Sequence, residues 1–197
     1  MFTLTRTQHT TDIPRSSTIL KEDKGERFLE YSKDAFAIVS GVLYIIHPSQ
    51  YMMGRQIHAQ LLSKQSCSET INAWPSVFGA LSVISNRSTP YHRDDQGHWA
   101  WYDILMSIGH YGIAPLYISP FRFRFDNVPG SLCIFSGMGL RHGVRECERP
   151  RISFAWYMRE KVRAGEGIPA ASWMRQSRYT ALVGTTKYGL HDRCLVD

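Results

Sequence analysis

Hydrophobic and polar residues alternate through much of the second half of the chain. The runs with this character are Val77–Ile84, Trp101–Ile108, Phe121–Phe125, Ser131–Phe135 and Arg151–Met158. The first two are almost continuously apolar, and the last alternates strictly. A period of two residues predicts β-strands, and several such strands separated by turns predict a β-sandwich or jelly-roll core. We therefore expect a mainly β fold with flanking helices.

The first half of the chain follows other patterns. Ile19–Tyr31 is interrupted by a polar turn that ends in a glycine, which predicts two short strands. Ala35–Ile46 is apolar, and its pattern does not distinguish a helix from a strand. Ser49 is a candidate N-cap, and apolar residues at helical spacing predict a helix from there to about Gln65. That helix would buttress one of the sheets.

Length and composition indicate one folded domain. The chain has 197 residues, of which 43% are hydrophobic and 20% charged, and no repeat or linker divides it. Residues 1–18 are polar, lack the apolar stretch of a secretory signal and are predicted to be flexible. Residues 19–197 then form a single domain with its β core at about 77–159. The longest apolar run, 35–46, is shorter than the roughly 20 residues that cross a bilayer, so we expect no membrane span.

The cysteines exclude two kinds of scaffold. Cys67, Cys133, Cys147 and Cys194 are far apart, and no C-x-x-C pair occurs. This spacing favours neither a zinc knuckle nor a disulfide framework. We expect reduced thiols in an intracellular monomer, located in the nucleus or cytoplasm, and in the nucleus if the substrate is DNA.

The positive charge is concentrated late in the chain. The formal net charge is +6, and nine Lys and Arg residues stand against four Glu residues between Arg141 and Arg178. Such a region attracts polyanions such as nucleic acids. A solvated basic surface without a partner explains the same charge equally well.

Two histidines and an aspartate are the candidate metal ligands. His92 and Asp94 are two residues apart, so on a strand both side chains leave the same face while Arg93 points away. The pair alone is weak, because a histidine in a surface loop would explain it. His142 lies 48 residues beyond Asp94, after a turn, a buried strand and a glycine-containing exit that can bring it beside the pair. Together they form the ligand set that holds Fe(II) and leaves positions open.

An arginine and a serine follow the last candidate ligand. Arg151 and Ser153 lie on one face of the next strand, opposite Ile152 and Phe154, and would point into the barrel. A buried guanidinium is costly unless it meets an anion, and a dicarboxylate cosubstrate supplies one. Arg149 is a rival for this role, although Pro150 follows it and no serine stands two residues on.

This series of residues resembles that of the 2-oxoglutarate/Fe(II)-dependent dioxygenases, a double-stranded β-helix superfamily. The similarity covers roughly Val77–Arg159 and includes the order of ligands, the strands between them and the R-x-S step. It implies that Fe(II) binds at His92, Asp94 and His142. It further implies that 2-oxoglutarate chelates the iron and places its far carboxylate on Arg151 and Ser153. With O2, such enzymes convert 2-oxoglutarate to succinate and carbon dioxide while they oxidise a C–H bond.

Two further residues are candidates for contact with the cosubstrate. Asn86 lies six residues before His92, and Tyr102 lies on the next predicted strand. Both are plausible contacts of the cosubstrate or supports of its ligands. A structural role explains them as well, because Asn often satisfies loop backbone and Tyr often packs a core.

The wider sequence of the chain resembles compact fungal dioxygenase domains grouped with the TET/JBP enzymes. The segments that carry this similarity are YHRDDQG, WYDILMSIG, PGSLCIFSGMGLRHGV and RISFAWYMR. The resemblance implies oxidation of a methyl group on a modified DNA base, 5-methylcytosine or N6-methyladenine. Animal TET proteins carry a cysteine-rich extension and a large insert that this chain lacks, so their mode of binding duplex DNA does not carry over.

Several residues are candidates for contact with such a base or its strand. His98, Trp99 and Trp101 could stack on an extruded base, although aromatic residues of a β-rich domain usually belong to its core. Asp95 could accept a hydrogen bond from an exocyclic amino group, or merely end its strand. Basic candidates for phosphate or substrate contact are Arg122, Arg124 and Arg159.

Two alternative functions remain open at this point. A hydroxylase of a small molecule or protein side chain would use the same iron site with a closed pocket. A non-catalytic nucleic-acid-binding module would use only the basic surface, although the complete ligand set argues against it.

Overall fold

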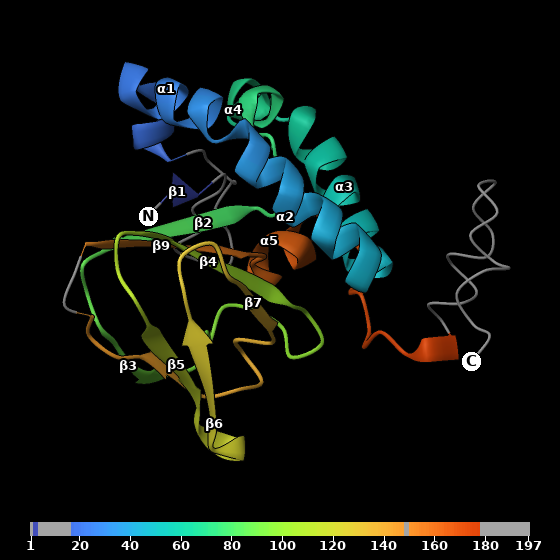
Figure 1. The fold of residues 1–197 in the computed structure, drawn as a ribbon. Helices are drawn as coiled ribbons and strands as arrows, with labels where there is room; N and C mark the ends of the chain where they lie inside the picture. Colours follow the sequence, from blue (N-terminus) through green and yellow to red (C-terminus); the bar gives the residue numbers. More distant parts are fainter. Residues whose placement is uncertain (1, 4–16, 148–149, 178–197) are drawn as a thin grey trace, which may run out of the picture.

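The computed structural model describes residues 2–3, 17–147 and 150–177, and the account below concerns these residues. The described part of the chain forms three layers: helices, a five-stranded sheet and a four-stranded sheet (Figure 1). We refer to the two sheets as the major sheet and the minor sheet. The helices between residues 23 and 73 cover the face of the major sheet that points away from the minor sheet (Figure 1).

The helices precede most of the strands along the chain. The helical elements are η1 (Thr18–Lys21), α1 (Asp23–Tyr31), α2 (Lys33–Ile46), α3 (Pro48–Leu62), α4 (Ser68–Ala73), η2 (Ser119–Phe121) and α5 (Glu160–Gly165). The strands are β1 (Phe2–Thr3), β2 (Ala80–Ser85), β3 (Thr89–His92), β4 (Asp103–Gly109), β5 (Ala114–Ile118), β6 (Phe123–Asn127), β7 (Leu132–Phe135), β8 (His142–Val144) and β9 (Arg151–Tyr157). Among the described helices, none is long and apolar enough to cross a bilayer.

The two sheets have a jelly-roll topology. The major sheet has the order β1-β2-β9-β4-β7 and the minor sheet the order β3-β8-β5-β6, and the strand pairings within both sheets are antiparallel. Successive strands from β2 to β9 alternate between the sheets, apart from β5 and β6, which pair within the minor sheet, and β9 returns to lie between β2 and β4. The jelly-roll core predicted from the alternating pattern is confirmed.

The main hydrophobic core lies between the helices and the major sheet. Phe36 on α2 is fully buried and meets the rings of Trp74 and Trp156 edge to face, at centroid distances of 5.2 and 5.7 Å. Val39 and Leu43 continue the same face of α2 and are also fully buried. Large side chains in such contacts contribute most of the stability of a core.

The prediction of two strands in Ile19–Tyr31 is wrong. This segment forms η1 and α1, because its apolar residues, including Leu20 and Leu29, bury against the core at helical spacing. Gly25 on α1 packs so closely on the backbone of η1 that a Cβ there would overlap the Ile19 carbonyl oxygen. The glycine that resembled a turn signal is therefore a helix-packing residue.

The other helical segments refine the sequence prediction. The apolar segment of undecided type is helix α2. The next helix begins at Pro48 and is capped by His47, whose Nδ1 accepts a hydrogen bond from the Gln50 N–H, so Ser49 is not the N-cap. A proline suits the first turn of a helix, where its missing N–H leaves no bond unmade.

The predicted flexible segment 1–18 contains two described pieces. Phe2–Thr3 pair with Leu81 and Ala80 of β2, and Thr18 begins η1. The rest of this segment lies outside the described residues, apart from Ser17.

Candidate active site

The three predicted metal ligands meet between the two sheets. His92 ends β3 and His142 begins β8, and these two residues are direct partners in the minor sheet. The His92 Nε2 lies 3.5 Å from Asp94 Oδ1, and the His142 Nε2 lies 3.7 Å from Asp94 Oδ2. One ligand atom from each residue falls within 4.8 Å of the others. The three side chains can therefore coordinate a single metal ion.

Backbone carbonyl groups orient both imidazole rings. The His92 Nδ1 donates to the Pro90 carbonyl oxygen at 2.8 Å, and the His142 Nδ1 donates to the Leu140 carbonyl oxygen at 3.0 Å. With the proton on Nδ1, the lone pair of each Nε2 faces the aspartate. Second hydrogen bonds of this type fix the tautomer that a metal requires.

The two histidines differ in their exposure to solvent. The side chain of His142 is 5% exposed and that of His92 38%, so the site opens on the His92 side. Burial lowers the pKa of His142, while the Leu140 carbonyl and the Asp94 carboxylate act in the opposite direction. A lowered pKa keeps this imidazole neutral and available to a metal at neutral pH.

A second carboxylate supports the site from the major sheet. Asp103, at the start of β4, is buried and accepts a hydrogen bond from the Gly137 N–H at 3.1 Å. The Gly137 carbonyl in turn accepts from the Asp94 N–H at 3.1 Å. Burial raises the pKa of Asp103 well above its usual range, and the charge of Asp94 raises it further. A Cβ at position 137 would overlap carboxylate oxygens of both Asp94 and Asp103, so a side chain there would displace these carboxylates.

A pocket between the sheets extends from the metal ligands to a buried arginine. Arg151, the first residue of β9, lines this pocket and is 2% exposed. Its Nη2 donates to the Arg87 carbonyl oxygen at 2.7 Å, whereas its Nε and Nη1 are buried without a hydrogen-bond partner among the described residues. A buried cation with unmet donors is costly, and a carboxylate is the anion that such a planar fork binds. The arginine thus fits the far carboxylate of 2-oxoglutarate.

Polar side chains surround this arginine. The Ser153 and Ser107 hydroxyl groups lie 2.9 Å apart, and the Asn127 side-chain amide donates to Ser107 at 3.2 Å. All three residues line the pocket. Burial raises the pKa of the Tyr111 phenol, while nearby Ser107 and Arg151 act in the opposite direction. The sequence predicts that Arg151 and Ser153 point inward, and both line the pocket.

Asn86 and Tyr102 both have structural contacts. Asn86 has a left-handed backbone with φ of 48°, and its Oδ1 accepts from the Arg151 N–H at 2.7 Å. Its own N–H donates to the Arg151 carbonyl oxygen at 2.8 Å, so Asn86 clamps the start of β9. Tyr102 exchanges backbone hydrogen bonds with the Gln50 side-chain amide, and its ring meets His47 edge to face. Neither residue is among those that line the pocket.

The candidate base contacts divide between the surface and the core. Asp95 is exposed and lines the pocket, and Trp99 is 59% exposed. The His98 ring lies 5.0 Å from that of Trp101 and accepts from the Ala100 N–H. Trp101 is 2% exposed and donates to the Ala171 carbonyl oxygen, so it belongs to the core and offers no surface for stacking.

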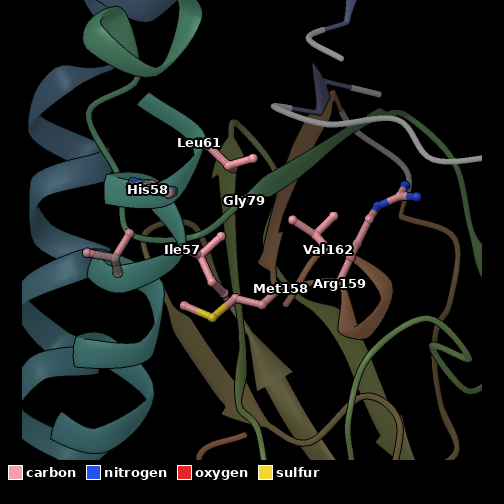
Figure 2. Close-up of a pocket in the computed structure, with 8 residues that line it drawn as sticks. Ile57, His58, Leu61, Gly79, Met158, Arg159 and Val162 are labelled. Carbon is pink, nitrogen blue, oxygen red and sulfur yellow. The ribbon is translucent and has the colours of Figure 1, made fainter. Parts of the chain in front are cut away.

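The basic candidates lie at different places. Arg159 lines a small hollow beside α3 and α5, and Figure 2 shows its guanidinium turned away from Ile57 and His58. Its guanidinium carbon is 5.8 Å from the ring centroid of Tyr157, which lines the metal pocket. Arg122 and Arg124 are exposed at the β6 hairpin. The rival Arg149 lies outside the described residues.

The pocket also contains residues that sequence reasoning missed. They are Arg87, Asp103, Ser107, Asn127 and Tyr157, which come from four separate places along the chain, since Asp103 and Ser107 share β4. No local motif unites them. Tyr157 alone carried a signal, because its position in the alternating run places it on the same face of β9 as Arg151 and Ser153.

The candidate metal site and the jelly-roll core together indicate a class of enzyme, the 2-oxoglutarate-dependent dioxygenases. A family model described as the oxygenase domain of the 2OGFeDO superfamily matches residues 5–160. The chain belongs to this family, the TET/JBP oxygenase domain, and the family implies Fe(II), 2-oxoglutarate and O2 as reactants or cofactors.

A solved structure has a similar fold. It is that of NgTET1 in complex with 5mC DNA, with a TM-score of 0.57 at 13% sequence identity. The match covers 88% of this chain and 64% of that one, so this chain spans less than two thirds of the length of its structural relative. No curated protein sequence matches the chain significantly.

Proposed function

We propose that this enzyme oxidises the methyl group of a modified DNA base, 5-methylcytosine or N6-methyladenine. Fe(II), 2-oxoglutarate and O2 supply the chemistry when bound: oxidation of a C–H bond, with succinate and carbon dioxide as co-products. The protein supplies ligands, orientation and a pocket that restricts water.

Each part of the pocket has a role in this proposal. His92, Asp94 and His142 hold the iron, and Arg151 with Ser153 holds the far carboxylate of 2-oxoglutarate. The observation that carries the proposal is the buried Arg151, whose Nε and Nη1 have no partner among the described residues although the side chain lines the metal pocket. A carboxylate with two oxygen atoms would satisfy both nitrogen atoms.

The substrate assignment has separate support. The family contains TET enzymes, and NgTET1 was solved with DNA that carries 5mC. The pocket is open near the half-exposed His92, and its lining there includes exposed Asp95 and Gln96 together with the Tyr157 ring. An extruded base needs polar groups for its edge and a flat side chain for its face, and these residues offer both.

Arg159 at the Tyr157 ring is the candidate basic contact at this opening. Trp99, which is exposed, and His98 are kept as candidate base contacts, although neither is among the residues that line the pocket. Binding of a base in this pocket favours a nuclear protein, which remains a proposal.

The proposal is tested with oligonucleotides of defined modification. The protein is loaded with Fe(II) without oxygen and then incubated in air with 2-oxoglutarate and strands bearing 5-methylcytosine, N6-methyladenine or no modification. We expect mass spectrometry of the nucleosides to show loss of one methylated base, with matching succinate. The variant Asp94→Ala should form neither product, because two imidazoles alone hold Fe(II) weakly.

Two outcomes would contradict the proposal in different ways. Succinate formation that responds to metabolites or peptides and ignores every oligonucleotide would indicate a hydroxylase of another substrate. Oligonucleotide binding without any turnover in the loaded protein would indicate a binding module.

A further inference from the structure

The outer face of the minor sheet carries a groove directly behind the metal ligands. Along β8, His142 points inward to the metal site, and Gly143 lies on the opposite face of the strand. Tyr91 and Tyr117 line the groove together with Gly143, and Tyr117 is the strand partner of Gly143. The two phenol rings therefore stand beside a floor that has no side chain.

The groove depends on the glycine. A Cβ at position 143 would lie 2.9 Å from the Thr89 carbonyl oxygen and 3.1 Å from the Tyr91 nitrogen. These distances are shorter than ordinary carbon contacts, so a larger residue would force β3 away from β8. Glycine here keeps the two strands together and leaves the space between the rings open.

Arginines lie over both rings. The guanidinium carbon of Arg145 is 4.9 Å from the centroid of Tyr117, and that of Arg141 is 5.9 Å from the centroid of Tyr91. Both arginines are exposed, and neither forms an ion pair with an acidic residue in the described part of the chain. Glu146 is the acidic residue of the lining. The face thus combines positive charge with flat aromatic surfaces.

The groove adjoins the metal pocket. Thr89 and Val144, which are partners across β3 and β8, line both the groove and the pocket. A chain that leaves the pocket over these two residues passes directly onto the tyrosines.

We propose that this groove binds the single strand that continues from the target base. Tyr91 and Tyr117 stack on neighbouring bases, and Arg141 and Arg145 contact the phosphates between them. This inference rests on the proposed function in one respect, which is that the substrate is a nucleic acid.

The chemistry of the groove favours a nucleic acid over an acidic peptide. Arginines alone would suffice for carboxylates, whereas alternating flat rings and guanidinium groups match alternating bases and phosphates. Arg124, the strand partner of Tyr117, extends the basic face across β6, although it pairs with Asp126 at 3.1 Å.

The test compares long and short substrates on groove variants of the full chain. The variants are the double substitution Arg141→Ala with Arg145→Ala, and Tyr117→Ala beside Tyr117→Phe. A matched control is Arg27→Ala, which removes an exposed positive charge on α1, across the major sheet from the groove (Figure 1). Binding is measured by fluorescence anisotropy on Fe(II)-loaded protein without oxygen, with methylated single strands of about fifteen and about three nucleotides.

We expect each alanine variant to bind the long strand about ten-fold more weakly, because removing a stacking platform or two phosphate-binding side chains has an effect of this size. The double arginine variant should also reduce the slope of log affinity against log salt by about 0.7 for each phosphate that is no longer neutralised. All variants should bind the short strand with the affinity of the wild type. Tyr117→Phe and Arg27→Ala should also bind the long strand with the affinity of the wild type.

Unchanged affinity of both alanine variants for the long strand would overturn the proposal. So would variants that lose binding of a polyglutamate peptide while they bind the strand normally, because the groove would then be a peptide site. The wild-type protein tests the underlying function. If it oxidises no oligonucleotide, the proposed function fails. If it oxidises one while the groove variants bind the long strand normally, only the proposal for the groove fails.

Discussion

The two faces of the major sheet show opposite ways of using the same strands. On the helical face, Trp156 is buried among Phe36 and Phe154, and apolar contacts fill the space. On the other face of the same strand, Arg151 and Ser153 line a polar pocket, and the arginine keeps two donors without partners among the described residues. The first arrangement stabilises the fold, while the second leaves interactions unmade until a ligand arrives. Neighbouring residues of β9 therefore have separable roles.

The strongest test of this separation is the loss of Trp156. The substitution Trp156→Ala should lower the free energy of unfolding by about 3–5 kcal/mol, because a large buried side chain leaves a cavity. Urea denaturation measures this loss. Ser153→Ala on the opposite face should cost at most about 1 kcal/mol, the value of one hydrogen bond, and should mainly weaken 2-oxoglutarate binding. Equal destabilisation by the two substitutions would contradict the separation.

Removal of Arg151 should affect cosubstrate binding more than the stability of the fold. Arg151→Ala should raise the 2-oxoglutarate concentration needed for half-maximal succinate formation by about 100-fold, the effect of losing a charge-assisted pair worth roughly 3 kcal/mol. Affinity for the metal should change little, which calorimetric titration with Mn(II) can check. An unchanged 2-oxoglutarate requirement would move the assignment to Arg149 or Arg159.

A glycine on each side of the major sheet gives a matched pair. Gly137→Ala places a Cβ against the carboxylates of Asp94 and Asp103, and it should weaken metal binding by about 10- to 100-fold, as other changes behind metal ligands do. Gly41→Ala on α2 meets open space and should stabilise the protein by up to about 1 kcal/mol with normal metal affinity. Mn(II) titration and thermal unfolding distinguish them. Normal metal affinity in Gly137→Ala would show that metal binding does not depend on the close packing of residue 137 against the Asp94 carboxylate.

A further prediction concerns the pH dependence of stability, which reports on the helical face. Burial and the nearby charge of Arg55 together lower the pKa of His58 to about 4, and burial also lowers the pKa of His47. The unfolded chain, with its histidine pKa near 6.5, then binds more protons, so stability is complete above pH 6.5 and falls as the pH drops toward 4. Urea unfolding at about pH 7.5 and about pH 5 should differ on the order of 2 kcal/mol.

The substitution His58→Leu isolates that effect. Its stability should depend less on pH than that of the wild type, because one titrating group is gone. A pH dependence that stays the same in this variant would assign the effect to His47 or to the carboxylates.

The sequence predicted the parts of this molecule that local patterns specify. Alternation along Arg151–Tyr157 placed Arg151 on the inner face, and the spacing of His92, Asp94 and His142 indicated a single metal site. These predictions depend on residues close in sequence, or on a single later strand that brings His142 back beside His92 and Asp94.

The errors and omissions arose where distant segments decide the outcome. The turn-like Gly25 is required by the close approach of η1, which no pattern within α1 reveals. Asp103 and Asn127 enter the pocket only because β4 and β6 belong to opposing sheets, and strand pairing across a jelly roll is not local. Trp101 illustrates the same limit, since its burial depends on residues as distant as Ala171.

Asn86 has a consequence for how tightly the cosubstrate binds. By holding both the N–H and the carbonyl of Arg151, it immobilises the start of β9 within the folded apoprotein. The entropy of ordering this backbone is therefore lost during folding, and the hydrogen bond from the Arg151 Nη2 to the Arg87 carbonyl oxygen restricts the guanidinium as well. Less entropy then has to be subtracted from the affinity for a dicarboxylate. The left-handed backbone of one asparagine is in this sense a device for preorganisation.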